Sequence, residues 1–140
     1  MNNLKFDHVG LSVQNLELEQ AFYAKAFEMT TVEEAVNMPE AQIRTMILSN
    51  ENGLKIELIE RQNSQAQEFE DAYDGANTQG YFHWALNVKN LDEIFVKMLN
   101  FGAKAVQEPQ DAMKKGAKFA YVKDPEGNLI ELIQPRNEEN

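Results

Sequence analysis

Residues 6–17 read FDHVGLSVQNLE, and residues 81–92 read YFHWALNVKNLD. Aligned without a gap, the two stretches share His, Leu, Val, Asn and Leu, and they pair Phe with Tyr and Glu with Asp. A second pair repeats at nearly the same spacing, with GLKIELI at 53–59 and GNLIELI at 127–133. Two repeats at one spacing indicate a duplicated module of about half the chain.

The first half is predicted to form a strand, a helix and further strands. Alternating residues open it, Asn15 is a candidate helix N-cap, and Asn52-Gly53 is a hairpin signal. We expect a strand at 5–13, a helix from Asn15 to about residue 27, a loop at 34–42, and strands at 43–48 and 54–60.

The second half is predicted to repeat this order. Asn90 and Glu93 form a capping-box pattern, and Gly102 is a natural helix end. Strands are expected at 117–122 and 129–134, on either side of a turn at 124–128. We therefore predict one domain over 1–140, made of modules 1–60 and 81–136. They are joined by a polar linker at 61–80, with a helical turn around 68–73.

The chain has 140 residues, no cysteine and a formal net charge of −10. A surface of this sign repels phosphate backbones and anionic headgroups, so we expect neither nucleic acid nor membrane as a partner. No apolar run approaches the ~20 residues of a membrane span, and residues 1–5 predict no secretory signal. Without cysteine, disulfides and thiolate metal sites are excluded, and a cytoplasmic location is expected.

The two histidines of the chain, His8 and His83, occupy equivalent positions in the repeats, and so do Glu57 and Glu131. Each module therefore offers one imidazole from its first strand and one carboxylate from its last. Strand alternation places each histidine on the face of small or polar residues, opposite the aliphatic face. Two modules related by a twofold axis would bring the four groups together.

A carboxylate flanked by aliphatic residues in a strand, as Glu57 and Glu131 are, is costly unless its charge is compensated. Two imidazoles and two carboxylates without sulfur suit Ni, Zn, Mn, Co or Fe(II). We therefore predict one divalent metal ion bound by His8, Glu57, His83 and Glu131, with one or two positions left for water or substrate. The alternative is a vestige of duplication, with ordinary hydrogen-bonded histidines and solvated carboxylates.

These residues resemble the vicinal oxygen chelate superfamily, which includes glyoxalase I, methylmalonyl-CoA epimerase, extradiol dioxygenases and fosfomycin- and bleomycin-resistance proteins. HVGLSV at 8–13 with Phe22-Tyr23 is similar to the family's opening, and DPEGNLIEL at 124–132 is similar to its closing signature. The resemblance covers nearly the whole chain. It implies an α+β fold of two tandem βαβββ modules whose curved mixed sheets enclose a metal cleft. The four candidate ligands match the ligand positions of the glyoxalase I pattern.

The resemblance implies a metal-dependent lyase or isomerase acting on a small molecule that chelates the ion through vicinal oxygens. The reaction would proceed by proton transfer and an enediolate-type intermediate, with Glu131 first and Glu57 second as the proton carrier. Hemithioacetals of the methylglyoxal type are the implied substrates. A homodimer is also implied, with modules pairing within one chain or across two. The alternatives are a ring-cleaving dioxygenase with Fe(II) or Mn(II), and a non-enzymatic binder of the bleomycin-resistance type.

One position departs from the glyoxalase I pattern, because Ser12 stands where its bacterial members carry a glutathione-binding Arg. Lys115-Gly116 resembles the family's basic loop near the substrate anion, although a solvated lysine run is an equal interpretation. We expect the segments 34–42 and 61–80 to line the cleft.

Overall fold

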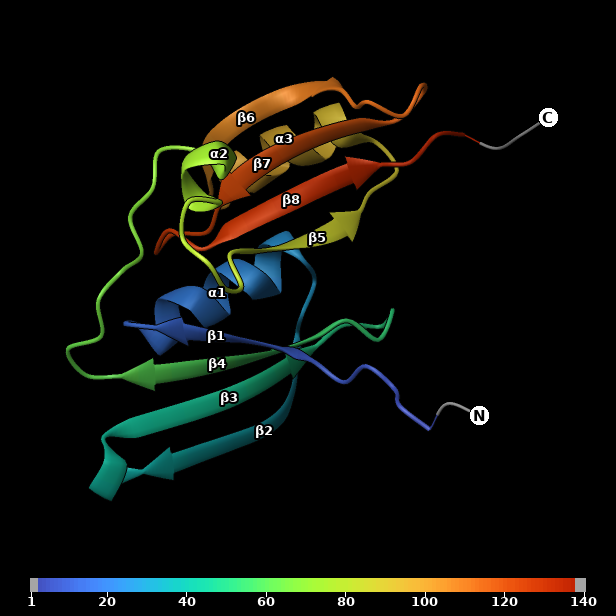
Figure 1. Ribbon diagram of the computed structural model, residues 1–140. Coiled ribbons are helices and arrows are strands. Elements are labelled where there is room, and N and C mark those ends of the chain that lie inside the picture. Colours follow the sequence, from blue (N-terminus) through green and yellow to red (C-terminus); the bar gives the residue numbers. More distant parts are fainter. Residues whose placement is uncertain (1–2, 138–140) are drawn as a thin grey trace. The chain divides into compact units, whose positions relative to one another are not determined.

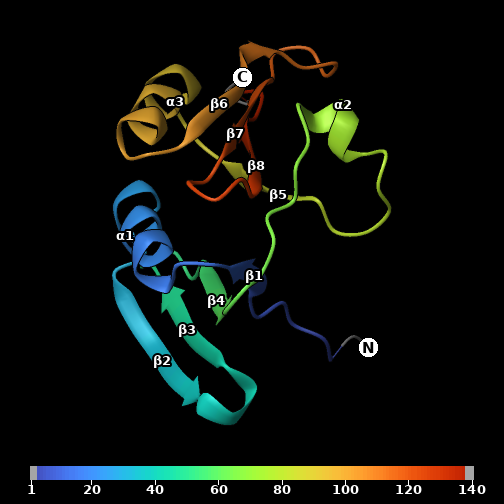
Figure 2. The same cartoon turned by 90° about the vertical axis from the view of Figure 1, so that its left-hand side faces the viewer.

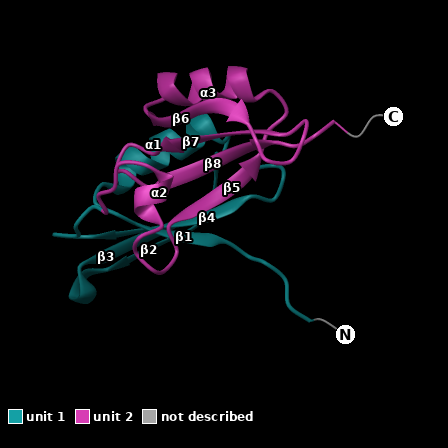
Figure 3. Cartoon of the chain, turned by 45° about the horizontal axis from the view of Figure 1, so that its top comes forward, with its two compact units in different colours: residues 1–66 teal, residues 67–140 magenta. Residues whose placement is uncertain are grey.

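The computed structural model describes residues 3–137 (Figure 1). The chain forms two compact units, residues 1–66 and 67–140 (Figure 3). Each unit contains a four-stranded mixed sheet and a long helix, in the order strand, helix and three strands. The prediction of two βαβββ modules is confirmed. Within the described residues, no helix has the length and apolar character needed to cross a membrane.

The first unit has the strand order β1-β4-β3-β2, with β1 parallel to β4 and the other neighbours antiparallel. Helix α1 packs on β3 and β4. The buried side chains Val13, Phe22, Tyr23, Ile56 and Leu58 form its core. Its elements are β1 (Val9–Val13), α1 (Leu16–Ala26), β2 (Thr31–Met38), the 3-10 turn η1 (Pro39–Ala41), β3 (Ile43–Ser49) and β4 (Lys55–Arg61).

The expected loop at 34–42 is wrong, because residues 34–38 belong to β2. This strand lies at the edge of its sheet, and all of its residues are exposed. Prediction of a strand relies on alternation between buried and exposed residues, which a strand with two exposed faces does not show. The first strand is also shorter than expected, because it begins at Val9 and leaves His8 directly before it.

The second unit repeats the topology, with the order β5-β8-β7-β6 and β5 parallel to β8. Helix α3 packs on one face of this sheet, and the short α2 lies on the other side (Figure 2). The helical turn expected at 68–73 is displaced to α2. The elements are α2 (Ala72–Gly75), β5 (His83–Asn87), α3 (Leu91–Asn100), β6 (Lys104–Asp111), β7 (Lys118–Lys123) and β8 (Leu129–Gln134).

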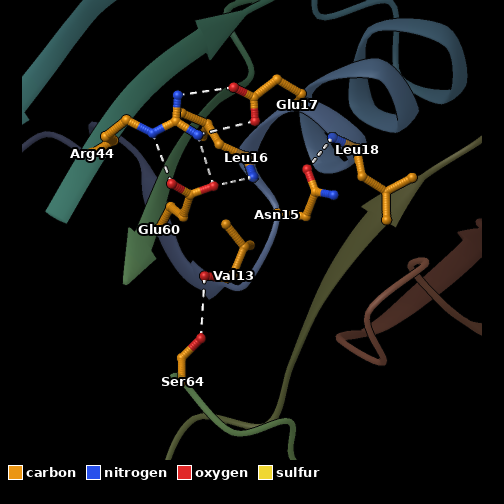
Figure 4. A network of polar contacts seen from close by, with 8 residues as sticks. All are labelled: Val13, Asn15, Leu16, Glu17, Leu18, Arg44, Glu60 and Ser64. Carbon is orange, nitrogen blue, oxygen red and sulfur yellow. Dashed lines mark hydrogen bonds and ion pairs between the residues drawn. The ribbon is translucent and has the colours of Figure 1, made fainter. Parts of the chain in front are cut away.

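A polar network fixes the start of α1 (Figure 4). The Asn15 side chain accepts a hydrogen bond from the amide of Leu18 at 3.0 Å, as an N-cap does. Glu60 accepts a second from the amide of Leu16 at 2.8 Å. Arg44 donates two hydrogen bonds to Glu60, at 2.7 and 2.9 Å, and also pairs with Glu17 on the helix. The network therefore ties the helix to β3 and β4.

The second unit repeats part of this network with different charges. Asn90 caps α3, and Gln134 accepts from the amide of Leu91 at 2.8 Å, as Glu60 does in the first unit. Lys118 pairs with Asp92 at 3.2 Å, at the positions equivalent to Arg44 and Glu17. The duplication is thus visible in individual hydrogen bonds as well as in topology.

The turn before the last strand is also built twice. The Asn50 side chain accepts hydrogen bonds from the backbone amides two and four residues later, both at 3.0 Å. Asp124 accepts from the equivalent amides at 2.9 and 3.0 Å. Because each turn leads into the strand that carries a candidate ligand, Glu57 or Glu131, these side chains help to set the register of the site.

Candidate functional site

In the first unit, His8 and Glu57 lie side by side. Glu57 is in β4, next to Gly10 of the parallel strand β1, and His8 directly precedes β1. His8 Nε2 is 3.5 Å from Glu57 Oε1, and the two side chains are 30% and 26% exposed. Both groups are therefore accessible to a small ligand.

The second unit holds the matching pair at equivalent positions. Glu131 in β8 is next to Ala85 of the parallel strand β5, whose first residue is His83. His83 Nε2 is 3.3 Å from Glu131 Oε1, with side-chain exposures of 22% and 19%. Each unit therefore brings one imidazole and one carboxylate together.

The surroundings of Nδ1 differ between the two imidazoles. His8 Nδ1 donates to Asp7 at 2.6 Å, which leaves Nε2 directed at Glu57. The hydrogen bond with His8, together with the hydrogen bond and charge of Lys55, holds the pKa of Asp7 below its usual value. In the described part of the second unit, His83 Nδ1 is buried without a hydrogen-bond partner. Phe82 instead packs edge-on against that ring, at 4.4 Å between centroids.

Glu131 has a neighbour that Glu57 lacks at the equivalent position. Tyr121 of β7 lies directly opposite Glu131, whereas the residue opposite Glu57 is Ile47. Burial, followed by the charge of Glu131, raises the pKa of Tyr121 to about 12. The Tyr121 ring also meets His83 edge-on at 5.4 Å. At neutral pH, Tyr121 is therefore a protonated donor.

A cavity of about 600 Å³ lies within the second unit, between α2 and the sheet face opposite α3. Much of its wall is apolar, and Glu131 and Tyr121 lie on it together with two cationic side chains, Lys114 and Arg136. Lys114 lines the cavity, while Lys118 of the same lysine run pairs with Asp92. An apolar cavity with a few polar groups is typical of a small-molecule site.

The donor pairs fit a divalent ion. Two ligand atoms about 2.1 Å from one ion, at angles between a right angle and the tetrahedral angle, lie roughly 3.0–3.4 Å apart. The separation of 3.3 Å in the second unit lies within this range, and that of 3.5 Å in the first unit lies just above it. Between residues 3 and 137, no cluster of three or more His, Cys, Asp or Glu side chains could hold an ion by itself. Each unit thus supplies two of the four predicted ligands.

The contact made by Asp7 and the position of Tyr121 were not predicted from the sequence. Of the two segments expected to line a cleft, 61–80 contributes Ala72, Tyr73 and Ala76 to the wall of this cavity, and 34–42 contributes none. The hairpin register could have revealed Tyr121, because counting back across the turn at 124–128 pairs it with Glu131. The contact of Asp7 could have been suspected because Asp7 directly precedes His8 in the sequence.

Comparison with known proteins identifies a matching family and similar proteins. A family model described as the Glyoxalase/Bleomycin resistance protein/Dioxygenase superfamily matches residues 5–132. A probable lactoylglutathione lyase of Synechocystis is 43% identical over 65 residues, which is 46% of this chain and 47% of that protein. A lactoylglutathione lyase of Arabidopsis thaliana is 25% identical over 136 residues, 95% of this chain and 45% of that protein. The chain thus matches about half the length of these curated relatives.

Solved structures show the same fold. A glyoxalase family protein from Enterococcus faecalis has a TM-score of 0.78 at 19% identity, covering 96% of this chain and 100% of that one. Glyoxalase I from Zea mays has a TM-score of 0.67 at 20% identity, covering 94% of this chain and 44% of that one.

Proposed function

Because the chain belongs to the glyoxalase/bleomycin resistance protein/dioxygenase superfamily, we propose that it is a metal-dependent lyase or isomerase of the glyoxalase type. The observation that carries the proposal is the matched pair of His–Glu contacts, at 3.5 and 3.3 Å, one in each unit. In this proposal, the His–Glu pair of each unit supplies half of one ligand set.

The proposed ligands are His8, Glu57, His83 and Glu131, and the proposed ion is Ni, Zn, Mn, Co or Fe(II). When bound, a divalent ion would supply Lewis-acid stabilisation of negative charge on vicinal oxygens of the substrate. The chain's own carboxylates would move the proton α to the carbonyl, Glu131 first and Glu57 second. A partly buried position strengthens the electrostatic contribution of these groups, because little water screens them.

Hemithioacetals of α-ketoaldehydes are the proposed substrates, since both curated relatives are named lactoylglutathione lyases. The cavity beside Glu131 would accept the apolar part of such a molecule, and Lys114 and Arg136 would favour an anionic group. Ser12 argues against the glutathione contact of the bacterial pattern. The thiol is therefore best identified with a panel of small thiols that includes glutathione.

Elemental analysis of protein purified without chelators tests the metal, and isomerisation of methylglyoxal hemithioacetals tests the activity. Glu131→Gln should abolish turnover, because an amide does not accept the proton. Glu108→Gln is the matched control, since this exposed carboxylate of the same unit lies in β6. Full activity of Glu131→Gln would contradict the assignment.

A non-enzymatic binder is the second candidate, and the cavity within the second unit favours it. A binder would retain affinity for its ligand after chelator treatment, whereas the proposed enzyme would lose turnover. A ring-cleaving dioxygenase would consume oxygen with catechols when loaded with Fe(II) or Mn(II). We further propose a cytoplasmic homodimer, to be checked by light scattering and cell fractionation.

A further inference from the structure

Among the described residues, only one of the two candidate imidazoles has an acceptor beside its Nδ1 atom. His8 Nδ1 lies 2.6 Å from one carboxylate oxygen of Asp7, whose other oxygen is 3.4 Å from Lys55 Nζ. His83 Nδ1 is buried, and within residues 3–137 it has no hydrogen-bond partner. The residue equivalent to Asp7 is Phe82, whose ring packs edge-on against His83 at 4.4 Å. The two copies of the module therefore surround the same ring atom differently.

At the other ring nitrogen the two copies match. His8 Nε2 is 3.5 Å from Glu57 Oε1, and His83 Nε2 is 3.3 Å from Glu131 Oε1. A neutral imidazole carries one proton, and the hydrogen bonds available to its two nitrogens decide which nitrogen holds it. At His8 the shorter contact, with Asp7, favours the proton on Nδ1. Within the described residues His83 meets a carboxylate only through Nε2, which favours the proton there.

We propose that Asp7 is a positioning residue that keeps the proton of His8 on Nδ1 and so presents the Nε2 lone pair to the metal ion. This inference rests on the proposed function. Metal-binding histidines commonly donate the proton of their other nitrogen to a carboxylate, which fixes the tautomer and the ring orientation. At His83 the proton must first move from Nε2 to the buried Nδ1, where a donor without a partner costs free energy. The two imidazoles therefore contribute unequally, and His8 is the one prepared for the ion.

NMR of nitrogen-labelled, metal-free protein without a purification tag reports the tautomers directly, because the chain has two histidines. Long-range proton–nitrogen spectra, recorded at alkaline pH to observe neutral imidazole, should show the proton on Nδ1 of His8 and on Nε2 of His83. His83→Ala assigns the signals. In Asp7→Ala the proton of His8 should move to Nε2, beside Glu57, while the signals of His83 stay unchanged.

Loss of such a partner typically weakens metal binding by about 10–100-fold. The Asp7 side chain is 66% exposed, so water replaces part of its contact with His8. We therefore expect Asp7→Ala to lower Co(II) affinity by roughly tenfold, measured by competition with a chromogenic chelator. Asp7→Asn keeps an acceptor oxygen and should lose less affinity. Asp111→Ala is the matched control, because it removes an exposed aspartate at the end of β6.

A double-mutant cycle separates positioning from simple attraction between the Asp7 charge and the ion. In a His8→Ala background, Asp7→Ala should cause no further loss of Co(II) affinity, because the ring that Asp7 positions is absent. Simple attraction would act in that background as well. Thermal unfolding of the metal-free variants measures structural damage separately.

The outcomes distinguish the two proposals. Failure of the unaltered chain to bind any divalent ion would overturn both the proposed function and this inference. The inference alone would fail if both imidazoles held their proton on the same nitrogen, or if Asp7→Ala left the His8 signals or the Co(II) affinity unchanged. Losses of affinity that multiply in the double mutant would also overturn it, since Asp7 would then act on the ion without acting through His8.

Discussion

Replacing Asp124 with Ala should destabilise the second unit strongly. Asp124 is fully buried, and its carboxylate accepts hydrogen bonds from the amide of Glu126 and from both the amide and the side chain of Asn128, at 2.8–3.0 Å. Each unsatisfied buried donor costs about 1–3 kcal/mol. Glu126 and Asn128 are only half-buried, so water replaces part of each bond. Summed over three donors, we expect a loss of about 2–4 kcal/mol.

The first unit supplies the control, because Asn50 supports the equivalent turn with a neutral amide oxygen. Asp124→Asn should therefore keep both backbone hydrogen bonds and cost about 1 kcal/mol. Thermal and urea unfolding measure both variants, with a drop in Tm of roughly 3 °C per kcal/mol for a chain of this size. Equal destabilisation by Ala and Asn would refute the reasoning, because it would mean that the charge matters and the acceptor geometry does not.

Three further predictions concern stability. Arg44 holds the pKa of Glu60 below its ordinary 4.5, so their ion pair stabilises the fold above that pH and is lost as the pH falls through the lowered value. Arg44→Met should flatten this part of the stability–pH curve in urea unfolding. Gly116→Ala should lower the free energy of unfolding by about 1–2 kcal/mol, because φ is +87° and the added Cβ would lie 3.0 Å from the Arg136 side chain. Gly53→Ala is the control and should cost less, because φ is similar at +84° but no atom lies within contact of the added Cβ. Saturating Ni(II) should raise Tm in the unaltered chain but much less in His83→Ala, as differential scanning fluorimetry can measure.

The module repeat and most elements could be predicted because the repeat carries local signals. Asn15 and Asn90 are side-chain caps in the structure, as their sequence patterns indicate. The strands on either side of the duplicated turns show clear apolar periodicity. The sequence also identifies His8 and His83, and Glu57 and Glu131, as equivalent residues, but the contact of His8 with Glu57 depends on β1 lying beside β4, which the repeat alone does not fix.

The remaining features depend on information that sequence periodicity does not contain. The edge strand β2 is exposed on both faces, so its residues resemble a loop. The position of Tyr121 opposite Glu131 depends on strand register, which is set by the turn held by Asp124. The cavity depends on where α2 lies against the sheet, and the polar segment around α2 gives no periodic signal.

Comparison of the two units indicates that Glu57 and Glu131 need a negative charge for a reason other than folding. The helix-capping position at the end of the last strand is Glu60 in one unit and Gln134 in the other, and both accept the same hydrogen bond at 2.8 Å. The fold thus tolerates a neutral amide there. At Glu57 and Glu131, both copies retain a carboxylate although aliphatic residues flank it, which folding alone does not favour. We therefore expect Glu57→Gln and Glu131→Gln to leave the metal-free protein as stable as the unaltered chain in urea unfolding, while each weakens metal binding. Loss of stability without loss of metal affinity would assign these carboxylates to the fold.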